Sequence, residues 1–253
     1  MLDQLFVYHP APWNERNWAA ESGLPLEDVW FRTPAGAMRF GWYVHVPQSE
    51  WVLLWCHGNA GNIADRLGNL RLLVEAGLSV FLFDYGGYGR SPGRPSEAGL
   101  YADALAAYDH VIVRRGVRPD RVALFGRSLG GAVAGEVVVQ RPIGALILES
   151  TFPSIEAVAK THYWGLPVHW LLGARFQLDD RVRTVCVPTL VVHGDRDDII
   201  PIQLGRAVYD ALGTQQKTWY AVSGADHNNV LMVGGQAYLQ RLLTFLRSVR
   251  QRA

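Results

Sequence analysis

Short, largely apolar runs that alternate with helical patterns constrain the fold of this chain more than any other feature. Five such runs follow one another: LSVFLFDY, RVALFG, GALILES, VPTLVVHG and KTWYAV. Helical patterns stand before and between them and at the end, over 63–76, 95–115, the residues after Ser128, 202–212 and 235–249. Continuous apolar strands separated by helices are typical of a parallel sheet buried on both faces. The sequence therefore predicts an α/β fold with a mostly parallel central sheet and helices on both of its faces.

The beginning of the chain has a different pattern. The runs DVWFRT, MRFGWYVHV and WVLLWCH are separated by the turn signals PAGA and PQSE, with no helical segment between them. Strands joined by short turns pair antiparallel, so these three runs predict an antiparallel opening to the sheet.

Length and composition fit one domain. The 253 residues, 49% hydrophobic and 19% charged, carry enough apolar surface to offset the entropy of the chain. Residues 151–183, rich in Trp, His, Pro and Leu, are longer than a crossover between two parallel strands requires. We expect a single domain over residues 1–253, with a small cap formed by residues 151–183.

Charge and cysteine usage exclude several classes of protein. The formal net charge is +1 and the basic residues are scattered, so the concentrated positive field of a nucleic-acid-binding protein is missing and no nucleic acid partner is expected. Cys56 and Cys186 are too few for a disulfide framework, and both lie in apolar runs where cysteine acts as a small hydrophobe.

The amino terminus, MLDQLFVYHP, has no basic start, and no part of the chain has the ~18 apolar residues of a membrane span. We expect a cytoplasmic protein. The apolar residues Leu2, Leu5, Phe6, Val7 and Tyr8 are expected to pack against the domain, with peripheral membrane contact as the alternative.

The stretch LFGRSLGGAV places Ser128 directly after an apolar strand, between Gly126 and Gly130. A nucleophile on a sharp strand-to-helix turn needs small neighbours two residues before and after it, because the backbones approach closely there. The N–H of Leu129 and the start of the following helix would then face a developing oxyanion. The alternative is a glycine-rich turn in which Ser128 is an ordinary helix cap.

Two further residues follow Ser128 in the order expected of a catalytic triad. Asp197 lies in VVHGDRDDIIP after one strand, and His227 lies in SGADHNN after the next. Nucleophile, acid and base in this order, each beyond the carboxyl end of a strand, would meet at one edge of a parallel sheet. His227 would then take the proton of Ser128, and Asp197 would orient the imidazole.

Other acids compete with Asp197 for this role. Asp195 and Asp198 lie in the same loop, and Glu149 ends the strand of LILES. Asp197 is favoured because it fits the spacing HG-x-x-D-x-x-I-P. Asp195 is expected to shape the turn, Asp198 to be solvated and Glu149 to be a structural hydrogen-bonding acid.

The glycine-rich loop HGNAGN, residues 57–62, follows another strand and lets the backbone approach a bound carbonyl. We expect the N–H of Asn59 to be the second oxyanion donor beside that of Leu129. His57 is expected to brace the loop by a hydrogen bond to backbone.

These motifs together resemble a known family. The set is HGNAGN, FDYGGYGRSPGRPSEAGLYAD, LFGRSLGGAVA, LESTF, HGDRDDIIP and GADHNN, which spans nearly the whole chain. It looks like the Bem46-type branch of the α/β-hydrolases, especially the ABHD13-like and ABHD17-like serine hydrolases. The resemblance implies an α/β-hydrolase fold, a nucleophile at Ser128, an acid at Asp197, a base at His227, no metal and no organic cofactor.

Two positions depart from the family pattern. Gly87 stands where relatives often carry arginine, and Asp226 stands where glycine usually precedes the histidine. Asp226 is expected to face solvent, with a charge effect on the basicity of His227 as the alternative.

The expected activity is hydrolysis of carboxylic esters or acyl thioesters through an acyl-enzyme on Ser128. Phe152, Trp164 and Trp170 of the insert would line an apolar pocket for the acyl chain of a small-molecule substrate, or would only pack the insert onto the core. The same triad also serves peptidases, amidases, C–C hydrolases and perhydrolases, and a non-catalytic ligand-binding protein on the same fold is the alternative of another class.

Overall fold

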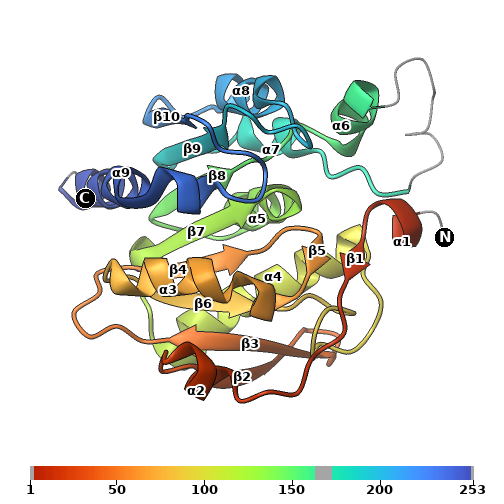
Figure 1. Cartoon of the computed structure of the whole chain (residues 1–253), viewed down its shortest axis with the longest axis vertical. Helices are drawn as coiled ribbons and strands as arrows, with labels where there is room; N and C mark the ends of the chain where they lie inside the picture. Colours follow the sequence, from red (N-terminus) through yellow and green to blue (C-terminus); the bar gives the residue numbers. More distant parts are fainter. Residues whose placement is uncertain (1–2, 163–172, 252–253) are drawn as a thin grey trace.

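The structure, a computed structural model, describes residues 3–162 and 173–251. Its centre is an eight-stranded sheet in the order β10-β9-β8-β7-β4-β6-β3-β2 (Figure 1). All neighbours from β10 to β6 are parallel, so their carboxyl ends lie at one edge. The strands are β2 (Glu27–Arg32), β3 (Met38–Val44), β4 (Val52–Cys56), β6 (Ser79–Phe83), β7 (Val122–Arg127), β8 (Ala145–Glu149), β9 (Thr189–Gly194) and β10 (Lys217–Val222).

Helices cover both faces of this sheet, as the alternation of patterns predicts (Figure 1). Alternate strand residues face opposite sides and form two separate apolar cores. One core is closed by α3 (Leu67–Glu75) and α9 (Val230–Arg250). The other is closed by α4 (Glu97–Arg115), α5 (Leu129–Gln140), α7 (Leu178–Val182) and α8 (Ile202–Ala211). The predicted fold class is therefore confirmed.

The antiparallel opening is confirmed only in part. β2 and β3 pair antiparallel, and β3 also pairs antiparallel with β6. β4, in contrast, lies between β6 and β7 and is parallel to both. All five residues of β4 are buried, which suits a central strand covered on both faces better than a strand of an edge hairpin.

The bounds of two helices differ from those that the sequence predicts. The pattern at 63–76 is a 3-10 turn, η1 (Ile63–Arg66), followed by α3, and Asn62 caps the turn through its side chain. The last helix, α9, begins at Val230, and Gly235, with φ 47°, is a non-helical residue inside it. Smaller elements are α2 (Trp18–Ser22) and η2 (Pro119–Arg121).

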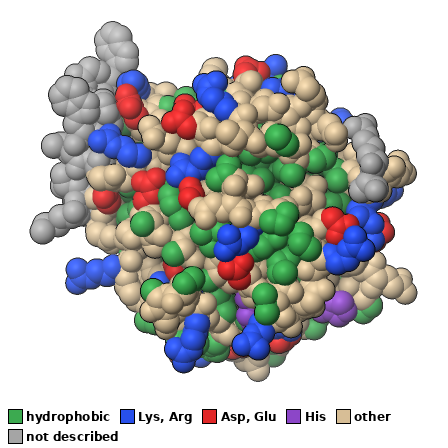
Figure 2. All heavy atoms as spheres, turned by 180° about the vertical axis from the view of Figure 1, so that it is seen from behind, with side chains coloured by type: hydrophobic (Ala, Val, Ile, Leu, Met, Phe, Trp, Pro, Cys, Tyr) green, Lys and Arg blue, Asp and Glu red, His purple; other side chains and the backbone are tan. Residues whose placement is uncertain are grey.

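The face covered by α4 and α5 carries acidic and basic side chains interspersed with apolar ones (Figure 2). Ion pairs join its elements: Arg141, at the end of α5, lies 2.9 Å from Asp109 of α4, and Arg181 of α7 pairs with Glu136 of α5. This mixture of charges on one face does not test the expectation of no nucleic acid partner, which stays a prediction.

The two cysteines have different surroundings. Cys56 ends β4 and is fully buried, as predicted for a small hydrophobe. Cys186 is exposed, so the prediction is wrong for this residue, which lies in the connection before β9 and not inside the strand.

The amino-terminal segment lies against the body of the protein. Val7 and Tyr8 are buried, whereas Phe6, at the end of α1 (Asp3–Phe6), is 56% exposed. A short strand, β1 (His9–Pro10), pairs with β5 (Ala60–Gly61) just after β4. No helix within the described residues is long and apolar enough to cross a membrane.

The insert between β8 and β9 begins with α6 (Ile155–His162), which lies near α1 beyond the end of the sheet, and ends with α7 (Figure 1). The two predicted pocket residues Trp164 and Trp170 lie outside the described residues. The expected cap over 151–183 and the single domain stay predictions.

Candidate active site

Ser128 occupies the sharp turn between β7 and α5. Its backbone angles, φ 54° and ψ −122°, lie in a region that residues with a side chain rarely adopt. Its side chain makes no capping hydrogen bond to the helix. The alternative interpretation of Ser128 as an ordinary helix cap is therefore wrong, and its Oγ is left for another partner.

The glycines on both sides of Ser128 are required by close backbone packing. A Cβ on Gly126 would lie 2.5 Å from the carbonyl oxygen of Gly130. A Cβ on Gly130 would lie 2.0 Å from the carbonyl oxygen of Cys56, at the end of the neighbouring strand β4. No larger residue fits either position without moving backbone.

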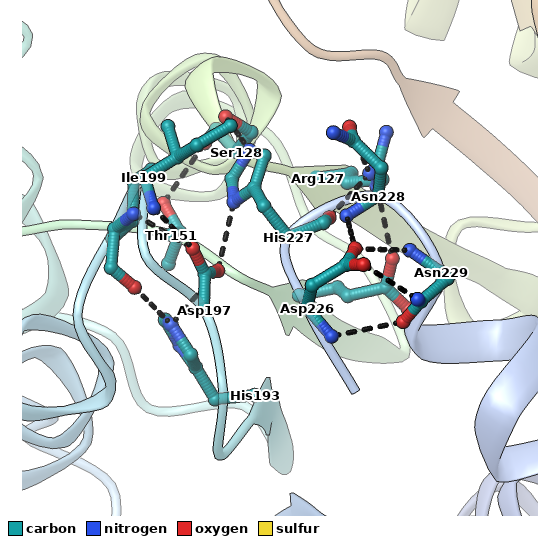
Figure 3. Close-up of polar contacts among 12 residues, drawn as sticks. Arg127, Ser128, Thr151, His193, Asp197, Ile199, Asp226, His227, Asn228 and Asn229 are labelled. Atoms are coloured by element: carbon teal, nitrogen blue, oxygen red, sulfur yellow. Dashed lines mark hydrogen bonds and ion pairs between the residues drawn. The ribbon is translucent and has the colours of Figure 1, made fainter. Parts of the chain in front are cut away.

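The structure brings Ser128, His227 and Asp197 together, in the order expected from the sequence (Figure 3). His227 Nε2 lies 3.0 Å from Ser128 Oγ, and His227 Nδ1 lies 2.8 Å from Asp197 Oδ2. All three residues are buried. The N–H at Nδ1 donates a hydrogen bond to the Asp197 carboxylate. Nε2 is then unprotonated and accepts a hydrogen bond from the hydroxyl of Ser128.

Asp197 is held in its ionised form by several donors. Burial alone would raise the pKa of this carboxyl group, but hydrogen bonds from His193, His227 and the N–H of Ile200 hold the pKa well below its usual value. The N–H groups of Ile199 and Ile200 donate to Oδ1 over 3.1 and 2.7 Å. A fixed, charged acceptor stabilises an imidazolium at His227.

His193 is a neighbour of Asp197 that sequence reasoning missed. Its Nε2 lies 2.8 Å from the carbonyl oxygen of Ile200 and 3.3 Å from Asp197 Oδ2, and its ring is fully buried. The signal was available: the histidine of HGDRD ends an otherwise apolar strand four residues before the acid.

The other acids take the structural roles expected of them. Asp195 is exposed and accepts a hydrogen bond from the N–H of Gly224 over 2.7 Å, between two loops. Asp198 is exposed. Glu149 is buried, and its Oε2 accepts from the hydroxyl of Tyr238 over 2.6 Å.

Arg127, the residue before Ser128, was also missed. Its side chain is buried, its Nε lies 3.1 Å from Glu149 Oε1, and its Nη2 donates to the carbonyl of His227 over 2.6 Å. An arginine at the end of an uncharged strand needs a buried partner for its charge. This position in the sequence is the signal that could have identified Arg127. Arg127 thus connects the serine turn to the histidine loop (Figure 3).

Asp226 organises the histidine loop and does not simply face solvent. It is half-buried, and its carboxylate accepts from the N–H groups of Asn228 and Asn229 over 2.7 and 3.2 Å. The Asn229 side chain also bonds both the carboxylate and the N–H of Asp226. The carboxylate therefore fixes the turn around His227, which corrects the expectation of a solvated charge.

The loop after β4 lies beside Ser128. A Cβ on Gly58 would lie 3.4 Å from Ser128 Cβ, so this loop passes against the serine. The carbonyl of Asn59 accepts from the N–H of His9 and the hydroxyl of Tyr88, over 3.0 and 2.8 Å. Among the described residues, no hydrogen bond engages the N–H of Asn59 or of Leu129, the two expected oxyanion donors.

His57 precedes this loop and is fully buried. Its Nδ1 lies 2.7 Å from the carbonyl oxygen of Gly58, which is the backbone contact expected of a bracing residue. Burial is the main reason that the pKa of His57 is lowered to about 3, so the ring is neutral.

A cavity of about 370 Å³ opens beside Ser128. Phe152, predicted to line an acyl pocket, contributes to its wall. Its other apolar walls are formed by Phe6, Val7, Leu129, Ile155, Val158, Ile199 and Ile200. No group of three or more potential metal ligands occurs in the part of the chain that the structure describes, and the expected absence of a metal stays a prediction.

Comparison with known proteins places this geometry in a family. The family model described as alpha/beta hydrolase fold matches residues 52–184. The uncharacterized protein Rv2307c of Mycobacterium tuberculosis (strain ATCC 25618 / H37Rv) is 41% identical over 231 residues, which cover 90% of this chain and 82% of that protein. The lysophosphatidylserine lipase ABHD12 of Danio rerio is 36% identical, over 78% of this chain and 58% of the lipase.

Solved structures show the same fold. The Pyrococcus furiosus esterase Pf2001 superposes with a TM-score of 0.78 at 17% sequence identity, over 96% of this chain and 98% of the esterase. The esterase domain of a Rhodothermus marinus protein superposes with a TM-score of 0.64 at 20% identity, over 87% and 99% of the two chains.

Proposed function

The chain belongs to the α/β-hydrolase family, and from that premise we propose that it is a serine hydrolase that cleaves carboxylic esters or acyl thioesters. The observation that carries the proposal is the continuous hydrogen-bonded chain from Ser128 Oγ through His227 to Asp197, with distances of 3.0 and 2.8 Å. The strained backbone of Ser128, paired with a histidine and not used as a cap, supports its role as nucleophile.

In the first half-reaction, Ser128 Oγ attacks the substrate carbonyl while His227 Nε2 takes its proton. Asp197 stabilises the imidazolium that forms. The N–H groups of Asn59 and Leu129 donate to the oxyanion of the tetrahedral intermediate, and α5, which begins at Leu129, adds the positive end of its dipole. His227 then protonates the leaving alcohol or thiol, and the acyl group remains on Ser128.

In the second half-reaction, a water molecule takes the place of the leaving group. His227 removes one of its protons as the water oxygen attacks the acyl-enzyme carbonyl. Collapse of this second intermediate returns the proton to Ser128 Oγ and releases the carboxylic acid. The same three residues thus act in both steps.

Two further observations favour esters and thioesters. The cavity beside Ser128 is lined mainly by apolar side chains, as a site for an acyl chain requires. One relative carries the name of a lysophosphatidylserine lipase, although this chain spans only 58% of that protein. In this proposal residues 151–183 cover the cavity as a small cap.

Labelling with a fluorophosphonate probe, read by intact mass and peptide mapping, tests the proposal. We expect a single label on Ser128 in the native protein and none in Ser128→Ala. His227→Ala should label far more slowly, because its serine lacks a base. Ser248→Ala, which removes a serine of α9 remote from the cavity, is the matched control and should label like the native protein. A folded native protein without a label would contradict the proposal.

A further inference from the structure

The cavity beside Ser128 contains two arginines, Arg66 and Arg127, and their electrostatic situations differ. Arg127 is matched by the buried carboxylate of Glu149, 3.1 Å away. Arg66, the last residue of η1, forms no ion pair with any described residue. One positive charge at the cavity wall therefore has no carboxylate at ion-pair distance within the described residues.

The hydrogen bonds of Arg66 leave part of its guanidinium unused. One Nη donates to the carbonyl of Ala60, and Nε is buried without a hydrogen-bond partner in the described structure. The carboxyl groups of Asp65 and Asp84 attract Arg66 without an ion pair to it. That of Asp65 accepts from the N–H of Asn62, and that of Asp84 accepts from the N–H of Ile63. Burial is the main cause that lowers the pKa of Arg66, and repulsion by Arg127 adds to it, whereas attraction by Asp65 and Asp84 offsets part of this effect.

The described walls of the cavity include no Asp or Glu side chain. A partly buried cation in such a cavity attracts an anion, because the anion replaces lost solvation and the low local dielectric strengthens the contact. Repulsion between the two arginines would also be relieved. The cavity is thus suited to a negatively charged group close to Arg66.

One apolar wall of the cavity lies on the other side of the serine. Sheet order is β8-β7-β4, and Ser128 follows β7, so segments that follow β8 and β4 flank it from opposite sides. Phe152, Ile155 and Val158 follow β8, whereas Arg66 follows β4 on the side of the expected oxyanion donor Asn59. An ester bound across Ser128 would meet apolar side chains at one end and, at the other, a guanidinium in addition to Phe6 and Val7.

We propose that the preferred substrates are amphiphilic esters, with an aliphatic acyl chain on the Phe152 side and a phosphate or carboxylate group in the leaving part, bound by Arg66. This inference rests on the proposed serine-hydrolase function and names its substrate class. Arg66 is a specificity-determining residue in it and has no part in the proton transfers.

Two matched pairs of octanoyl esters test the inference. The phosphate arm compares the esters of glycerol 3-phosphate and of glycerol, and the carboxylate arm compares the esters of glycolate and of glycolamide. In the native protein we expect kcat/KM for the anionic member of at least one pair to exceed that of its neutral partner by ~10-fold. The arm with the larger ratio identifies the anion.

The ratio within the preferred pair is then measured in variants. Arg66→Gln should bring it close to one, whereas Arg66→Lys, which keeps the charge, should retain most of it. Arg32→Gln, which removes the same charge from an exposed position on β2, should leave it as in the native protein. A ratio that does not change in Arg66→Gln, or a native ratio near one in both arms, would overturn the inference.

Failure of this inference and failure of the proposed function give different results. Hydrolysis that persists in Ser128→Ala would refute the function itself. If hydrolysis is lost in Ser128→Ala but the ratio of kcat/KM between the anionic and the neutral ester does not depend on Arg66, the proposed function stands and only the anion site is refuted. Fluorophosphonate labelling of Ser128 in Arg66→Gln checks that the variant has folded around an intact serine.

Discussion

Arg127 Nη2 donates a hydrogen bond of 2.6 Å to the main-chain carbonyl of His227, a residue 100 positions later in the sequence. The contact is buried and continues through Glu149 to the hydroxyl of Tyr238 in α9. The residue next to the proposed nucleophile therefore holds the loop that carries the proposed base. Because the carbonyl and not the ring is bonded, Arg127 fixes the position of His227 and leaves its two ring nitrogens for Ser128 and Asp197.

Replacement of Arg127 should reduce turnover by misplacing His227. We expect Arg127→Met to lower kcat by ~10- to 100-fold, with a smaller change in KM, because a shift of the base by an ångström affects proton transfer more than binding. The variant should also lose about 3–5 kcal/mol of stability, since Glu149 becomes a buried charge without its partner.

The double variant Arg127→Met, Glu149→Gln separates the two effects. Removal of both charges should restore much of the stability, whereas kcat should stay low. Thermal unfolding and steady-state kinetics with one ester measure both quantities. Recovery of kcat together with stability would show that Arg127 has only a structural role.

The close packing behind the serine turn predicts a strong contrast between two glycines. Gly130→Ala would place a Cβ 2.0 Å from the carbonyl oxygen of Cys56, so backbone must move and we expect a loss of about 3 kcal/mol together with most activity. Gly68→Ala, in α3, meets nothing within 4 Å and should gain about 0.5–1 kcal/mol. Denaturant unfolding measures both, and equal effects of the two substitutions would contradict the packing argument.

The sequence predicts those features that depend on local patterns. Apolar runs and helical periodicity correctly indicate the α/β fold, and residues that follow parallel strands, such as Ser128 and His227, lie at the same edge of the sheet. Strand pairing is not local, and the place of β4 between β6 and β7 was missed for that reason.

The hydrogen-bond partners of charged side chains could not be predicted from the sequence either. Nothing near Arg127 in the chain indicates that its hydrogen-bond acceptor is 100 residues away, nor that Asp226 would bond the N–H groups of its own turn. Burial of Cys186 was wrongly predicted because apolar neighbours in the sequence do not show which way a side chain points, and Cys186 is exposed before β9 begins at Thr189. For Arg127 the missing information is a tertiary contact, whereas for Asp226 it is the conformation of its own turn.

Asp197 should control both turnover and acid stability. Asp197→Asn leaves His227 without a charged acceptor, and we expect kcat to fall by ~10⁴-fold. Because the folded-state pKa of Asp197 is depressed, its contribution to stability is present above the usual carboxyl pKa and is lost as the pH falls towards the lowered value. The melting temperature of Asp197→Asn should therefore fall less between pH 5 and pH 3 than that of the native protein.

Asp198→Asn is the matched control for this substitution. Asp198 lies next in the chain and is exposed, so its replacement should change neither kcat nor the acid dependence of the melting temperature beyond error. A similar loss of kcat in both variants would mean that the loop as a whole, and not the Asp197 carboxylate, supports catalysis.

Asp84 should make the protein less stable as the pH rises. It is fully buried, and burial is the main cause that raises its pKa from 3.8 to about 7. The N–H groups of Ile63 and Arg90 and the charge of Arg66 only partly offset this effect. Its Oδ2 has no hydrogen-bond partner among the described residues, and His57 Nε2, 3.7 Å from Oδ1, belongs to a neutral ring. The folded state therefore binds a proton at pH 5 to 6 that the unfolded chain has already released.

The contribution of Asp84 to the free energy of unfolding is fully present below the usual carboxyl pKa and is lost as the pH rises towards about 7. The loss of stability then reaches on the order of 4 kcal/mol. Asp84→Asn cannot ionise and keeps an acceptor for Ile63, so its melting temperature relative to the native protein should rise between pH 5 and pH 8. Asp180→Asn, at an exposed position of α7, should show no such trend. A native protein whose stability grows over this range, with Asp84→Asn parallel to it, would show that Asp84 is ionised in the folded state at pH 5.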